Sequence, residues 1–172
     1  MKTKLEHMNI KEKTYRDNGA VGALLDEYEK ALEELIELIA RISEKELTYI
    51  VDAETKDPNC HSIQSILSHV VNAGHWYVFE IRQSRGDESP LYQMESSDSI
   101  AVYQKALRAM FEANVQLFND HPNIPLESFK PTEKIRVRWG QHYDVEQLVE
   151  HAIVHILRHR RQIERFLIKI GA

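Results

Sequence analysis

The sequence predicts an all-α protein, a four-helix bundle with long connections. Four stretches carry apolar residues at every third or fourth position over the length of a long helix, which gathers those residues on one helix face. Proline and glycine concentrate in the segments between these stretches, where they interrupt helices. Helices with one apolar face each bury those faces by packing together, so the pattern favours a bundle.

The chain has 172 residues, a length that suits one domain. Residues 1–17 are polar and aperiodic, so we expect an N-terminal arm over residues 1–18 and the bundle domain over residues 19–172. The net charge of −5 argues against a nucleic-acid partner. No signal peptide or bilayer-length apolar run is apparent, so we expect a cytoplasmic protein with no membrane partner.

The first helix is expected over about residues 19–42. Its apolar positions alternate by three and four and comprise Val21, Leu24, Tyr28, Ala31, Leu35, Leu38 and Ile42. Residues 44–46 then read as a polar turn, and a connection follows with a brief extended piece at Leu47–Val51.

The second helix is predicted from Ser62, its N-cap, to about Ser84. A polar loop separates it from the third helix, for which Ser97 or Asp98 is the expected cap. The third helix should end by His121, because the proline that follows cannot continue it.

Residues 121–143 form the longest irregular stretch, interrupted by three prolines and a glycine. Within it, residues 135–139 alternate in polarity and are expected to be briefly extended. The last helix should begin at Asp144, which forms a capping box with Gln147, and should continue to about Ile170.

The last helix carries three histidines at every fourth position. At about 100° per residue, His155 and His159 fall inside its apolar arc, whereas His151 lies near the edge. Such an i, i+4 pair presents two neutral nitrogens to one point, and an open metal site needs a third ligand from another helix. His69 on the second helix is the best supplier, because this helix is an expected neighbour and small Ala73 beside His69 leaves room. Its competitor His75 faces a different edge, so one helix could scarcely use both.

Two other interpretations of these histidines stay open. Buried rings with hydrogen-bonded partners would give a metal-free bundle, and a closing fourth ligand such as Glu80 would give a non-catalytic metal-binding bundle. The histidine pair lacks the internal glutamate of HExxH, which argues against a zinc peptidase. The single cysteine, Cys60, excludes an intramolecular disulfide framework, and no nucleophile signature surrounds it.

Arginines cluster on the last helix at Arg158, Arg160, Arg161 and Arg165. A solvated helix face is the first interpretation, because the helix dipole favours cations toward the C-terminal end. An anion site or partner site is the alternative.

Two segments resemble the DinB/YfiT-like superfamily of metal-dependent four-helix-bundle proteins. They are Ser62–His69, which reads Ser-Ile-x-x-Ile-Leu-x-His, and His155–Ile163, which reads His-x-x-x-His-Arg-x-Gln-Ile. The resemblance extends over about residues 19–170, and Arg161 departs from the glycine that is frequent in the family. It implies a divalent ion, zinc or nickel, and a homodimer. The metal ligands that it implies are His69, His155 and His159.

The resemblance further implies a metal-dependent enzyme that acts on a small molecule, such as an S-transferase that uses a low-molecular-weight thiol. A metal-dependent hydrolase and a non-catalytic metal-binding or interaction bundle are the alternatives. No side chain is assigned as catalytic, because metal-bound water or a thiolate at the open position would react. Gln162, one turn beyond His159, is a candidate outer partner of the ligands. Trp139, Tyr143 and His151 are expected to line the mouth of the site.

Overall fold

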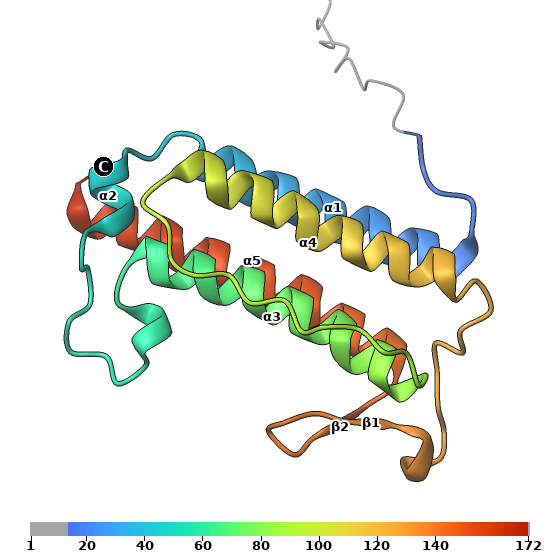
Figure 1. The fold of residues 1–172 in the computed structure, drawn as a ribbon. Helices are drawn as coiled ribbons and strands as arrows, with labels where there is room; N and C mark the ends of the chain where they lie inside the picture. The colour runs from blue at the N-terminus through green and yellow to red at the C-terminus, as the bar shows by residue number, and fades with distance from the viewer. Residues whose placement is uncertain (1–13, 172) are drawn as a thin grey trace, which may run out of the picture.

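The structure, a computed structural model, describes residues 14–171, so most of the predicted N-terminal arm lies outside the described residues. Four long helices within this range form an all-α bundle, which confirms the predicted fold class (Figure 1). These helices are α1 (Gly19–Ile39), α3 (Ile63–Ser84), α4 (Ile100–Asp120) and α5 (Val145–Ile170). No helix in the described range combines the length and the apolar character that crossing a bilayer requires.

The four long helices contact one another in a ring, in which α1 packs on α4 and α5, and α3 packs on the same two helices. In Figure 1, α1 and α5 run in one direction and α3 and α4 in the other. The connection of residues 85–99 returns along the length of α3 to the start of α4. As a result, α3 and α5 lie side by side and antiparallel, which places their inward faces opposite each other.

The segment after α1 differs from the sequence prediction. Helix α1 ends at Ile39, and a short helix α2 (Glu44–Thr48) replaces the expected polar turn and the first two residues of the expected extended piece. Ser43 forms a capping box with Glu46, in which the Ser43 hydroxyl accepts from the Glu46 backbone N–H and the Glu46 carboxylate accepts from the Ser43 N–H. The one apolar residue of α2 that is buried, Leu47, fixes the helix on the core.

The caps of the other helices explain where they begin. Ser62 caps α3 through Ser65, and Asp144 caps α5 through Gln147, as the sequence predicted. The predicted cap of α4 was wrong, because the cap position is occupied by Ser99. The Asp98 carboxylate accepts instead from Gln64 on α3, at 2.7 Å.

A small hairpin lies between α4 and α5. Its strands β1 (Ile135–Arg136) and β2 (His142–Tyr143) are antiparallel, and Ile135 pairs with Tyr143. Strand β1 contacts α3 and β2 contacts α5, while Ile135 and the following Val137 are buried in the core. Gly140 has a φ of +89°, which suits the turn because glycine has no Cβ. Two short 3₁₀ turns, η1 (Pro58–Cys60) and η2 (Pro131–Glu133), complete the described elements.

Close packing of α3 on α4 generates a stability prediction at Gly74. A Cβ atom at this position would lie 2.0 Å from Met110 Sδ and 2.6 Å from its Cγ, and Met110 is fully buried. Overpacking costs about 1–3 kcal/mol, whereas replacing a helical glycine by alanine contributes up to about 1 kcal/mol. We therefore expect Gly74→Ala to lower the free energy of unfolding by about 1–2 kcal/mol in urea denaturation.

The Met110→Ala background is the matched control for this change. Without the methionine side chain the clash disappears, and Gly74→Ala should then raise the stability of the single Met110→Ala variant. A destabilisation of equal size in both backgrounds would contradict the proposed clash.

Candidate metal centre

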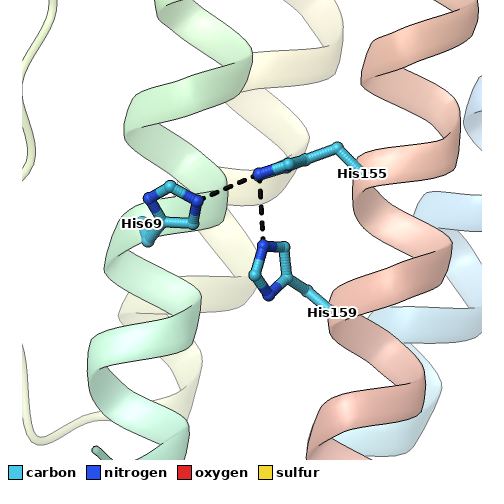
Figure 2. A group of neighbouring side chains, drawn as sticks. All are labelled: His69, His155 and His159. Carbon is cyan, nitrogen blue, oxygen red and sulfur yellow. Dashed lines mark hydrogen bonds between the residues drawn. The ribbon is translucent and has the colours of Figure 1, made fainter. Parts of the chain in front are cut away.

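Three histidines converge at the contact between α3 and α5. Figure 2 shows His69 projecting from α3 toward His155 and His159, which come from consecutive turns of α5. The Nε2 atom of His155 lies 3.0 Å from His69 Nε2 and 3.2 Å from His159 Nε2. A ligand nitrogen from each of the three rings lies within 4.8 Å of the other two, so the group could hold a metal ion.

The separation of these nitrogens fits a shared ion. Two nitrogens that bind one tetrahedral ion at about 2.0–2.1 Å lie about 3.3–3.4 Å apart. The observed separations of 3.0 and 3.2 Å are slightly shorter, so a small outward movement of the rings would seat the ion. The donors are three imidazoles, which suit zinc, nickel and similar divalent ions.

The hydrogen bonds available to three neutral rings also favour a shared ion. A neutral imidazole nitrogen carries either one proton or one lone pair in the ring plane, so it makes one good hydrogen bond. His155 Nε2 faces two neighbouring nitrogens, and it can therefore satisfy His69 or His159 but not both. An ion that accepts a lone pair from every ring removes this conflict.

The electrostatic environment keeps the rings neutral. Burial and then the neighbouring His159 and His69 rings lower the pKa of His155 to about 2. Burial and His69 lower the pKa of His159 to about 4, and burial lowers the pKa of His69 as well. At neutral pH all three rings are therefore in the form that binds metals.

An outer partner orients one of the rings. The side-chain oxygen of Gln162 lies 3.0 Å from His159 Nδ1 and can accept its proton. That hydrogen bond puts the proton of the ring on Nδ1 and leaves the Nε2 lone pair facing the other histidines. The structure thus places Gln162 where the sequence analysis expected an outer partner of the ligands.

A pocket of about 270 Å³ opens beside the triad. His69 and His155 form part of its wall, and the remaining lining residues are Ala73, Trp76, Tyr77, Arg138, Trp139 and His151. Trp139 of the hairpin turn stacks on His151, with ring centroids 5.5 Å apart and an interplanar angle of 29°. The Tyr143 ring centroid lies 5.6 Å from that of His151. Of the three residues expected at the mouth of the site, Trp139 and His151 line this pocket, whereas Tyr143 lines a neighbouring hollow together with His151.

Sequence analysis missed three lining residues, Trp76, Tyr77 and Arg138. A signal for the first two existed, because positions seven and eight after His69 lie on the same helix face. Arg138 lies over the Trp76 ring, 5.1 Å from its centroid, and this contact depends on how the hairpin folds back on α3. No local pattern in the sequence predicts that contact.

The other residues that the sequence analysis considered do not join this group. His75 packs against Tyr92, with ring centroids 4.2 Å apart. Glu80 is not among the His, Cys, Asp and Glu side chains that converge on the triad within the described range. Burial raises the pKa of Cys60, whose thiol lies 3.5 Å from the Asp57 carboxylate, so Cys60 lacks the lowered pKa of a nucleophile.

The fold and this geometry define a class, a helical bundle with a candidate metal centre between two neighbouring helices. The sequence model of the DinB family matches residues 6–172, and the chain belongs to the DinB family. This match confirms the resemblance drawn from the two histidine motifs. A comparison with curated proteins finds no match.

The hydrogen bond to His159 generates a prediction about metal affinity. Gln162→Leu removes the acceptor and leaves the His159 ring free to rotate or change tautomer. We expect this variant to bind zinc about 10–100-fold more weakly in a competition titration with a chromophoric chelator.

Gln162→Glu serves as the control, because it retains an acceptor at the same place and should keep most of the affinity. Equal zinc affinity for the wild type and Gln162→Leu would contradict the orienting role.

Proposed function

We propose that this protein is a divalent-metal-dependent enzyme that acts on a small molecule, with zinc or nickel held by His69, His155 and His159. The observation that carries the proposal is the convergence of three neutral imidazole nitrogens beside a pocket. Such an ion supplies Lewis acidity, which lowers the pKa of a thiol or of water that it binds.

The pocket wall indicates what kind of group would enter. Trp76, Trp139 and His151 offer ring faces to an apolar or planar group. Arg138 places a permanent positive charge on the same wall, which favours an anionic group such as a thiolate. Burial raises the pKa of Tyr77 to about 12, so its phenol stays protonated and can donate a hydrogen bond.

These properties support an S-transferase that joins a low-molecular-weight thiol to an electrophilic small molecule. The ligand set would hold the ion, Arg138 would attract the thiol in its ionised form, and the aromatic wall would orient the electrophile. A volume of about 270 Å³ is close to the lower end of ligand pockets, which agrees with small reactants. The homodimer implied by the family resemblance stays a prediction.

The two alternatives differ in what would bind the ion besides the three histidines. A metal-dependent hydrolase would use the same ion with water in place of the thiol. A non-catalytic metal-binding bundle would need a closed coordination sphere. Within residues 14–171 no carboxylate or thiol joins the three histidines, and this favours an open position over a closed one.

Metal content tests the ligand assignment. We expect wild-type protein purified without an affinity tag to hold about one divalent ion per chain, because three preorganised ligands bind strongly. His155→Ala removes the central nitrogen and should abolish stoichiometric metal in elemental analysis.

The matched control is His151→Ala, which changes a histidine one turn away on the same helix and outside the group. It should retain the ion. Metal loss in both variants, or a wild type that never holds an ion after reconstitution, would refute the assignment.

Turnover tests the reaction class. Metal-loaded protein should conjugate low-molecular-weight thiols to an aryl halide or an epoxide, and His155→Ala should reduce the rate to background in a thiol-consumption assay.

Hydrolysis of ester or amide substrates without any thiol would favour the hydrolase instead. Stoichiometric metal with no turnover in either assay would favour the non-catalytic bundle.

A further inference from the structure

A second pocket, of about 800 Å³, lies farther along α5 than the pocket beside the triad. Its wall combines the C-terminal half of α5 with Asp52 and Cys60 from the connection that precedes α3. This pocket shares no lining residue with the pocket beside the triad. The two pockets therefore have separate walls, and Gln162 of the second pocket also bonds His159 of the triad.

Four cations of α5 line this second pocket, namely Arg158, Arg161, Arg165 and Lys169. We call them the α5 cation row. Lys169 donates to the Val51 carbonyl at 2.9 Å, which fixes the connection on the helix end but leaves the charge in place. The acidic side chain on the wall is Asp52, whose carboxylate accepts from the Thr55 backbone N–H. The pocket is therefore strongly positive.

The arginines of the row have no anionic partner within the described part of the chain. The structure shows no ion pair or hydrogen bond for the guanidinium groups of Arg158, Arg161 and Arg165 in residues 14–171. Arg160 provides a contrast on the same helix turn, because it pairs with Glu34 on α1 and with Glu164. On this part of α5, the arginines that line the pocket are thus unpaired within the described residues, whereas Arg160, which does not line it, is paired.

The spacing of the row adds to its positive potential. Arg161 and Arg165 are four residues apart, as are Arg165 and Lys169, and like charges at this spacing repel each other on a helix. The helix dipole offsets part of this repulsion near the C-terminus, but it favours cations on every side of the helix equally. The dipole therefore does not explain why the cations collect over a hollow instead of over open surface.

The length of the row indicates the size of a matching ligand. The outermost arginines of the row, Arg158 and Arg165, are separated by about 10 Å along the helix axis at about 1.5 Å per residue, and Lys169 lies about 6 Å farther along. A single carboxylate or phosphate would reach one or two guanidinium groups, whereas a molecule with two anionic groups could engage both ends. Guanidinium groups suit this task because each can donate two parallel hydrogen bonds to an anionic group.

We propose that the pocket over the α5 cation row binds a small molecule that carries two or more anionic groups, carboxylates or phosphates. Binding there requires no metal ion, because the row and the triad line separate pockets. The inference therefore stands apart from the proposed enzyme activity, and either can fail without the other.

Calorimetric titration of the full-length protein tests this proposal, with adipate as the dicarboxylate and fructose 1,6-bisphosphate as the bisphosphate. We expect saturable binding of at least one of them, weakened by salt, and weaker binding of acetate and inorganic phosphate. The Arg161→Gln/Arg165→Gln double variant should lose at least about tenfold in affinity, because two charge-assisted contacts disappear. The two ligands distinguish carboxylate from phosphate recognition.

Two control variants locate the effect. Lys105→Gln removes a positive charge from the exposed surface of α4, across the bundle from the row, and should leave the affinity within about twofold because distant charges are screened. His155→Ala lacks the proposed metal centre and should bind the anion like the wild type. Circular dichroism of each variant checks that its helices are intact.

Three outcomes would overturn the proposal. The first is that the wild type binds neither adipate nor fructose 1,6-bisphosphate. The second is that Lys105→Gln weakens binding as much as the double variant does. The third is that His155→Ala abolishes binding. The last result would place the anion at the triad instead of over the α5 cation row.

Discussion

The antiparallel contact of α3 with α5 is the constraint on which the candidate site depends. It buries three imidazole rings at one point, and burial keeps them neutral. Neutral rings that face each other cannot all be satisfied by protons, and an unsatisfied buried polar group costs about 1–3 kcal/mol. A structural zinc ion contributes about 10–16 kcal/mol of apparent binding free energy in small metal-binding peptides, so an ion would far outweigh that conflict.

The hairpin contributes two side chains, Arg138 and Trp139, to the pocket beside the triad. Ile135 and Val137 are buried in the core, and they fix the turn that carries Arg138 and Trp139. Trp139 is 42% exposed even though its ring lies against His151 and Trp76, so part of the side chain remains open to solvent. The helices thus position the proposed ligands, while a short loop anchored by apolar side chains provides part of the pocket wall.

Much of the fold could be predicted from the sequence because the information was local. Apolar periodicity located the four long helices, and the N-cap at Ser62 and the capping box at Asp144 located two of their starts. The i, i+4 spacing of His155 and His159 also follows from one helix alone. Helix α2 was missed although Ser43 and Glu46 have the spacing of a capping box, because its five residues are too few to show a periodic pattern.

What the sequence could not predict depends on packing between distant segments. The path of residues 121–143 determines which side chains meet α3, so the contact of Arg138 with Trp76 had no local signal. The cap of α4 was misplaced for a similar reason, since Asp98 is engaged by Gln64 from another helix. His69 was a candidate ligand because of its face on α3, but only the contact between helices brings it 3.0 Å from His155.

One helix serves both pockets because His151 and His155 line the first, whereas residues farther along α5, from Arg158 to Lys169, line the second. Successive residues advance by about 100°, so Gln162 falls about 20° to one side of His155 and Arg158 about 60° to that same side. Core residues such as Ile156 and Ile163 lie on the opposite side of His155. The face therefore changes gradually from apolar through imidazole and amide to guanidinium. The histidines lie where burial is sufficient to keep them neutral. Gln162 lies between the histidines and the arginines, because it is bonded to His159 and also lines the cationic pocket.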